Sequence, residues 1–85
     1  MNSIEKKIIK LDEVSKINRD SLVLCHGHFN IIHPGHIRYL DFAHTQGEKL
    51  LVTLEGEHYF EGFDRKHFYS EDERAAGVAS MEKVD

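Results

Sequence analysis

The sequence has one cysteine, one proline and no tryptophan among its 85 residues, and these scarcities exclude whole classes of protein. A single Cys25 cannot form an internal disulfide, which argues against a small secreted domain held together by disulfides. No apolar run approaches the roughly 20 residues of a membrane span, and the charged N-terminus lacks the apolar core of a signal peptide. We therefore expect a cytoplasmic protein with no membrane partner.

Positive charge is also scarce. Eleven Lys and Arg residues face fifteen Asp and Glu residues, which gives a formal net charge of −4. Such a chain has no general field that attracts nucleic acid, so no nucleic-acid partner is expected. An anionic ligand would have to be held by a local cluster of donors. The length fits one domain over residues 1–85.

The pattern of apolar residues and turn signals predicts helix, strand, helix, strand, loop and helix, in that order. The expected elements are a short helix from Asp12, a strand over 21–26, a helix from Pro34 to a C-cap at Gly47, a strand over 50–54 and a helix from the Ser70 cap to about Lys83. Ser70 and Glu73 have the spacing of a capping box.

A strand, a crossover helix and a second strand make a βαβ unit, whose strands should be parallel. The fold class is therefore α/β, a Rossmann-like parallel sheet with helices on both faces. A sheet of two parallel strands rarely stands alone, because both of its faces need cover. We expect residues 1–85 to be the N-terminal part of a larger domain, incomplete at the C-terminus.

What the sequence has in excess is histidine. The stretch GHFNIIHPGH and the residue before it hold four imidazoles: His26, His28, His33 and His36. This stretch follows a buried-type strand and opens a helix, where free backbone N–H groups and the helix dipole favour phosphate. His33 and His36 are three residues apart and share a face of the first helical turn. The spacing suits phosphoryl or nucleotidyl transfer.

A metal site is the other chemical interpretation of this cluster. Four neutral imidazoles could complete a tetrahedral zinc site, although all would come from one short loop and no cysteine spacing supports it. Simpler structural roles are open for His26 and His28, and Cys25 fits a core position. The aromatic residues near the end of the chain are either a lid or core cover: Tyr59, Phe60, Phe63, Phe68 and Tyr69.

HPGH, at His33–His36, resembles the HxGH signature of the nucleotidyltransferase (cytidylyltransferase-like) superfamily, and GHFNII resembles the lead-in to it. SEDERAAGVASMEKVD resembles the helix that carries a family Glu-Arg pair, here Glu73 and Arg74. The likeness is greatest to the branch that activates sugar phosphates or polyol phosphates. It implies transfer of a nucleotidyl group from CTP or ATP to such an acceptor, with release of pyrophosphate and with Mg²⁺ on the triphosphate.

The resemblance also implies roles for individual residues. His33 and His36 would be catalytic, contacting phosphates and stabilising the transition state. The expected nucleotide- and phosphate-binding residues are Gly27, His28, Phe29, Gly35, Arg65, Lys66 and Arg74. No protein-held metal is expected. Arg74 would face phosphate or brace the loop.

Three departures from the family pattern keep alternatives open. His28 stands where relatives have a small residue, Asn30 replaces an aspartate, and the family's second nucleotide motif lies beyond position 85. The chain could instead be a nucleotide-binding or structural fragment without turnover, or a histidine-cluster metal-binding module. Exposed apolar surface on an incomplete sheet would favour a homodimer.

Overall fold

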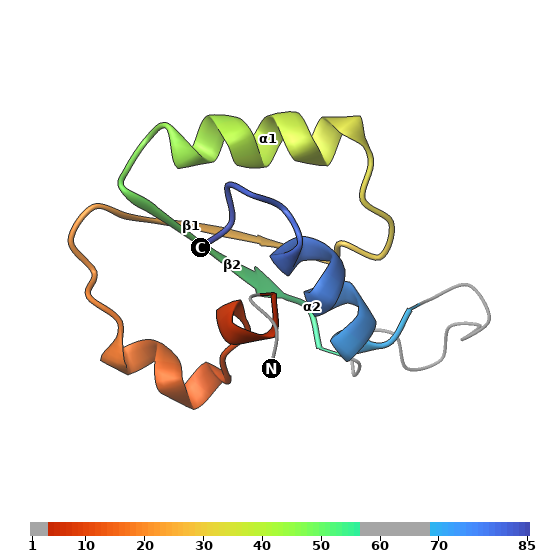
Figure 1. The fold of residues 1–85 in the computed structure, drawn as a ribbon, viewed down its shortest axis with the longest axis horizontal. Helices are drawn as coiled ribbons and strands as arrows, with labels where there is room; N and C mark the ends of the chain where they lie inside the picture. Colours follow the sequence, from red (N-terminus) through yellow and green to blue (C-terminus); the bar gives the residue numbers. More distant parts are fainter. Residues whose placement is uncertain (1–3, 57–68) are drawn as a thin grey trace.

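The computed structural model describes residues 4–56 and 69–85, which form a two-stranded parallel sheet with helices packed against it (Figure 1). The elements in chain order are the 3₁₀ segments η1 (Glu5–Lys7) and η2 (Leu11–Lys16), then β1 (Leu22–Gly27), α1 (Pro34–His44), β2 (Lys49–Leu54) and α2 (Glu71–Ala79). Figure 1 shows α1 running back alongside the two strands that it connects. The predicted α/β class and the parallel βαβ unit are confirmed.

The register of β1 against β2 sorts the strand residues onto two faces. Cys25 pairs with Val52, and His26 pairs with Thr53. Because successive side chains point to opposite faces, Cys25 and Val52 share one face while His26 and Thr53 share the other. The first face is apolar and buried, and the second has exposed positions such as Leu24, 62% exposed.

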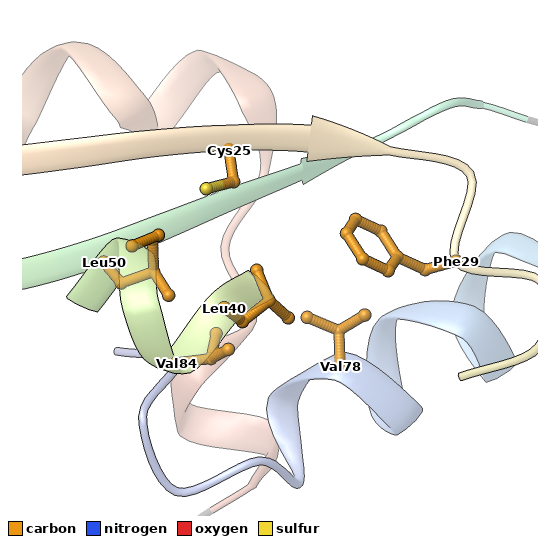
Figure 2. Close-up of a cluster of buried hydrophobic side chains, with 7 residues drawn as sticks. Cys25, Phe29, Leu40, Leu50, Val78 and Val84 are labelled. Atoms are coloured by element: carbon orange, nitrogen blue, oxygen red, sulfur yellow. The ribbon is translucent and has the colours of Figure 1, made fainter. Parts of the chain in front are cut away.

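The hydrophobic core lies on the Cys25 face of the sheet (Figure 2). Leu40 from α1 and Leu50 from β2 are fully buried, and Val78 from α2 packs into the same cluster. Figure 2 shows Phe29 pointing into this cluster from the chain just beyond β1. Both α-helices are therefore fixed against the same core that supports the end of β1.

The expected C-cap at Gly47 is wrong. Helix α1 ends at His44 with Thr45 as the C-cap, and the Thr45 hydroxyl donates to the Phe42 carbonyl oxygen at 2.6 Å. A Cβ on Gly47 would collide with the Ser21 carbonyl oxygen and lie 2.8 Å from Val23 Cγ2. Glycine is needed there because the chain passes close to the start of β1.

Helix α2 begins where the capping box predicts but ends earlier than expected. Ser70 Oγ accepts from the Glu73 N–H, and the Glu73 carboxylate accepts from the Ser70 N–H, both at 3.1 Å. After Ala79 the chain turns back toward β2, which lets Val84 enter the core and lets the Asp85 N–H donate to the Leu50 carbonyl at 3.0 Å. A longer helix would carry Val84 away from the core.

The N-terminal segment differs in detail from the helix expected at Asp12. It forms the 3₁₀ segment η2, and none of its residues is buried. Among the described residues, no helix has the length and apolar character that crossing a membrane requires.

Candidate functional site

The loop between β1 and α1 is shaped by Phe29, whose backbone has φ 50°. This left-handed conformation is uncommon for a residue with a side chain. It turns the Phe29 ring back into the core, where the residue is 4% exposed. The ring fills the space beside Gly27, because a Cβ there would lie 2.8 Å from Phe29 Cε2. Glycine and phenylalanine thus fit together at the carboxyl end of β1, the end where α/β sheets gather ligands.

His33 caps the N-terminus of α1 with its own side chain. Its Nδ1 accepts from the Gly35 N–H at 3.0 Å, a role more often filled by Ser, Thr or Asp. The imidazole lies directly over Gly35, where a Cβ would be 2.7 Å from His33 Cε1. Gly35 is therefore required for the His33 ring to lie at the helix start.

His36 completes a reciprocal arrangement with His33. Its Nδ1 accepts from the His33 N–H at 3.3 Å, and the two ring centroids are 4.0 Å apart. A nitrogen that accepts a hydrogen bond carries no proton, so each neutral ring carries its proton on Nε2. Both histidines are therefore oriented as Nε2–H donors at the positive end of a helix.

The surroundings of His36 favour its neutral form. Partial burial lowers the pKa of His36 below its ordinary value, the nearby His33 lowers it further, and hydrogen bonding to the Ile31 backbone opposes both. The Phe29 ring lies 5.3 Å from the His36 ring, centroid to centroid, at an interplanar angle of 59°. At neutral pH His36 is thus uncharged and held against an aromatic ring, and a ligand that accepts from its Nε2–H would replace the Ile31 backbone as the partner.

Arg74 braces the segments around the site. It is 2% exposed, and its Nη1 donates to the carbonyl oxygens of His28 at 3.0 Å and Glu55 at 2.6 Å. Its Nε donates to the Tyr69 carbonyl at 3.2 Å. One guanidinium therefore joins the chain just beyond β1, the chain just beyond β2 and the start of α2.

Asn30 adds a second link between the loop and α2. Its Oδ1 accepts from the Tyr69 N–H at 2.7 Å. An aspartate could accept the same hydrogen bond, so the departure from the family pattern at this position preserves the contact. A hollow of about 580 Å³ lies beside this link, lined by the loop after Phe29 and by the first turns of α2. Neither His33 nor His36 lines it.

The four histidines do not form one cluster. His26 belongs to β1 and is hydrogen-bonded to Thr53 and Glu55, whereas His33 and His36 stack at the start of α1. His28 is exposed, and its carbonyl accepts from Arg74. Within residues 4–56 and 69–85, no group of three or more His, Cys, Asp or Glu side chains could hold a metal ion.

Two of the predicted site residues, Arg65 and Lys66, lie outside the described residues, as do four of the five aromatic residues considered as a lid or core cover. The fifth, Tyr69, is 54% exposed. One group of polar side chains, formed by His26, Thr53 and Glu55, is not apparent from the sequence. Alternation places Thr53 and Glu55 on one face of β2, but only the register against β1 brings His26 to them.

Comparisons with known proteins identify the family. The cytidylyltransferase-like family model matches residues 24–85, which include the HPGH loop and α2. The bifunctional protein HldE of Campylobacter fetus is 34% identical over 88 residues, which cover 99% of this chain and 19% of the relative. HldE of Helicobacter pylori (strain J99) is 32% identical over 90 residues, which cover 100% of this chain and 19% of the relative. HldE of Pseudomonas fluorescens is 35% identical over 52 residues, which cover 61% of this chain and 11% of the relative.

The chain thus spans 19% or less of the length of these curated relatives. The family match begins on β1, at Leu24, and continues through both helices to Asp85. The chain belongs to the cytidylyltransferase-like family of nucleotidyltransferases.

Proposed function

We propose that this domain transfers a nucleotidyl group from CTP or ATP to a phosphorylated sugar or polyol, with release of pyrophosphate. The observation that carries the proposal is the pair His33 and His36, stacked at the N-terminus of α1 with both Nδ1 atoms accepting backbone N–H groups. This arrangement leaves Nε2–H as the donor of each neutral ring, at the positive end of the helix where a phosphate would bind. A triphosphate is the ligand in this family that needs such a set of donors.

Nucleotidyl transfer requires that the reacting groups are positioned and that the developing charge is stabilised. A phosphate oxygen of the acceptor attacks the α-phosphorus of the nucleotide, the new P–O bond forms, and the bond to the β-phosphate oxygen breaks in line to release pyrophosphate. Negative charge builds on the non-bridging α-phosphate oxygens and on the leaving group. Fixed donors such as the Nε2–H groups of His33 and His36 stabilise that charge without having to reorganise.

The neighbouring residues would support this step. Gly35 leaves room for the His33 ring, while Gly27 and Phe29 set the course of the loop. Arg74 would hold the loop in place through backbone carbonyls, and His28, Arg65 and Lys66 would add contacts to the nucleotide.

The residues near α1 fit Mg²⁺ only as a companion of the triphosphate. Magnesium prefers oxygen ligands, keeps several waters and is commonly held through substrate phosphates. The His33–His36 turn offers imidazoles and backbone N–H groups rather than carboxylates. When bound, the ion would neutralise part of the phosphate charge.

Thermal unfolding with and without nucleotide tests the proposal. The wild-type chain, His36→Ala and His44→Ala would each be melted with Mg²⁺ alone, with Mg²⁺ and CTP, and with Mg²⁺ and ATP. A ligand at about 100 times its dissociation constant adds roughly 2.7 kcal/mol, or on the order of ten degrees in a domain of this size.

We expect one nucleotide to raise Tm for the wild type and for His44→Ala, whose substitution lies at the other end of α1, and to leave His36→Ala unchanged. An equal rise in His36→Ala would contradict the assigned site. Release of pyrophosphate in the presence of glycerol 3-phosphate or a hexose 1-phosphate then separates a transferase from a fragment that only binds nucleotide.

A further inference from the structure

A polar cluster that the proposed reaction does not use lies at the carboxyl ends of β1 and β2. His26 Nε2 is 2.9 Å from Glu55 Oε1, and His26 Nδ1 is 2.7 Å from Thr53 Oγ1. A carboxylate only accepts, so the neutral imidazole places its proton on Nε2 and accepts at Nδ1 from the Thr53 hydroxyl, which also lies 3.4 Å from the Cys25 carbonyl oxygen. His26, Thr53 and Glu55 thus form a chain of oriented hydrogen bonds, here called the His26 cluster.

The His26 cluster is open to ligands. The side chains of His26 and Glu55 are 50% and 35% exposed, and Thr53 is half-buried. The preceding residues on the same face, Leu24 and Leu51, are apolar, and the polar side chains of His26 and Thr53 follow them at the ligand end of the sheet. A strand can fold without polar side chains on its exposed face, so folding alone does not account for His26, Thr53 and Glu55.

Arg74 ties the His26 cluster to the His33–His36 turn. Its Nη1 holds the carbonyl of Glu55, which belongs to the cluster, and the carbonyl of His28, which begins the loop toward His33. The two polar sets therefore lie at one end of the sheet and are joined by a buried side chain. One set offers donors for phosphate, and the other offers a carboxylate and a hydroxyl.

We propose that the His26 cluster binds hydroxyl groups of the acceptor and so selects among phosphate-bearing acceptors by their hydroxyl groups. The carboxylate of Glu55 accepts from ligand hydroxyls through the lone pairs that His26 leaves open, and the Thr53 oxygen accepts another. The hydrogen bond from His26 orients the Glu55 carboxylate and leaves its other lone pairs for the ligand. This inference rests on the proposed nucleotidyl transfer.

Binding measurements with defined probes test the inference. Calorimetry would compare inorganic phosphate, glycerol 3-phosphate, glucose 1-phosphate and ethyl phosphate, each added in the presence of Mg²⁺ and the α,β-methylene analogue of the nucleotide that binds, which cannot release pyrophosphate. The variants are Thr53→Val, Glu55→Ala and the conservative Thr53→Ser. Glu48→Ala, at an exposed glutamate before β2, is the matched control.

For the wild type and Glu48→Ala we expect a polyol phosphate to bind about tenfold or more tightly than inorganic phosphate, the scale of charge-assisted hydrogen bonds. Ethyl phosphate, which has no hydroxyl group, should show no such gain. Thr53→Val and Glu55→Ala should lose the gain yet keep their affinity for nucleotide and inorganic phosphate, and Thr53→Ser should restore it. If Glu55→Ala fails to fold, the comparison of Thr53→Val with Thr53→Ser decides whether the cluster binds acceptor hydroxyls.

The outcomes separate the two proposals. If nucleotide binds but the polyol preference is absent in the wild type, or survives both Thr53→Val and Glu55→Ala, the inference is overturned and the proposed function stands. If these variants lose nucleotide and inorganic phosphate to the same extent as polyol phosphate, the cluster is structural and the inference is again overturned. If the wild type binds no nucleotide, the proposed function and the proposed role of the His26 cluster are both overturned.

Discussion

At the scale of single residues, the protein uses histidine side chains where other proteins use hydroxyls or carboxylates. His33 caps α1, and His36 accepts a backbone N–H in return. A carboxylate in either place would cap the helix equally well but would repel phosphate. An imidazole caps through Nδ1 and still has a donor at Nε2, so one side chain serves the fold and the site at once.

The lowered pKa of His36 predicts a loss of stability in mild acid. The unfolded chain takes up a proton near the ordinary value of about 6.5, whereas the folded state does so at a lower pH. Stability from this residue is therefore fully present above pH 6.5 and is lost as the pH falls toward the folded pKa. Asparagine at this position keeps a side-chain acceptor for the His33 N–H but does not titrate.

We expect Tm to fall less between pH 7.5 and pH 5.5 in His36→Asn than in the wild type, measured by circular dichroism. His44→Asn serves as the control, because it shows how much the pH dependence of Tm changes when a histidine outside the site is replaced. A wild-type chain and His36→Asn with the same pH dependence would show that His36 is not held neutral in the folded state.

At the scale of elements, the Arg74 side chain connects the ends of β1 and β2 with the start of α2. Three of its hydrogen bonds go to backbone carbonyls that follow β1 and β2 or precede α2. Charge-assisted hydrogen bonds of this kind are the stronger class, and breaking them leaves buried acceptors unsatisfied. Helix α2 thus contributes to the site through one buried side chain.

Arg74→Met should destabilise the protein by on the order of 3 kcal/mol, because the charge-assisted bonds are lost while the carbonyls stay in place. Urea unfolding followed by circular dichroism measures this change. Arg38→Met, an exposed arginine on α1, should cost less than about 0.5 kcal/mol. Equal effects of the two substitutions would mean that Arg74 does not brace the loops.

At the scale of the whole molecule, the elements and the start of the site could be predicted from sequence because they depend on neighbours in the chain. Pro34 and the histidine spacing marked the start of α1, and Ser70 with Glu73 marked the start of α2. Features that depend on contacts between distant parts of the chain could not be predicted from the sequence. They include the close approach of Gly47 to Ser21 and the pairing of His26 with Glu55. The three-residue spacing of Ile37, Leu40 and Ala43 in the sequence predicts one apolar face of α1, but only Leu40 and Ala43 are buried, and Ile37 is 44% exposed.

The buried position of Arg74 illustrates the same limit. The sequence showed an arginine on a helix, which is ordinarily a solvent-exposed residue. Only the packing of α2 against the strand ends places its guanidinium within reach of His28 and Glu55. Whether Arg74 braces or binds could therefore not be decided from the chain alone.

In the proposed reaction, His33 and His36 present Nε2–H groups to the nucleotide. Nitrogen-15 NMR of the imidazole rings, with and without Mg²⁺ and nucleotide, measures both the tautomer and the contact. We predict Nε2–H tautomers for both residues in the free protein, and Nε2 resonances that shift on adding CTP or ATP while those of His44 do not. Nδ1–H tautomers in the free protein, or bound nucleotide without a shift at either Nε2, would contradict the claim.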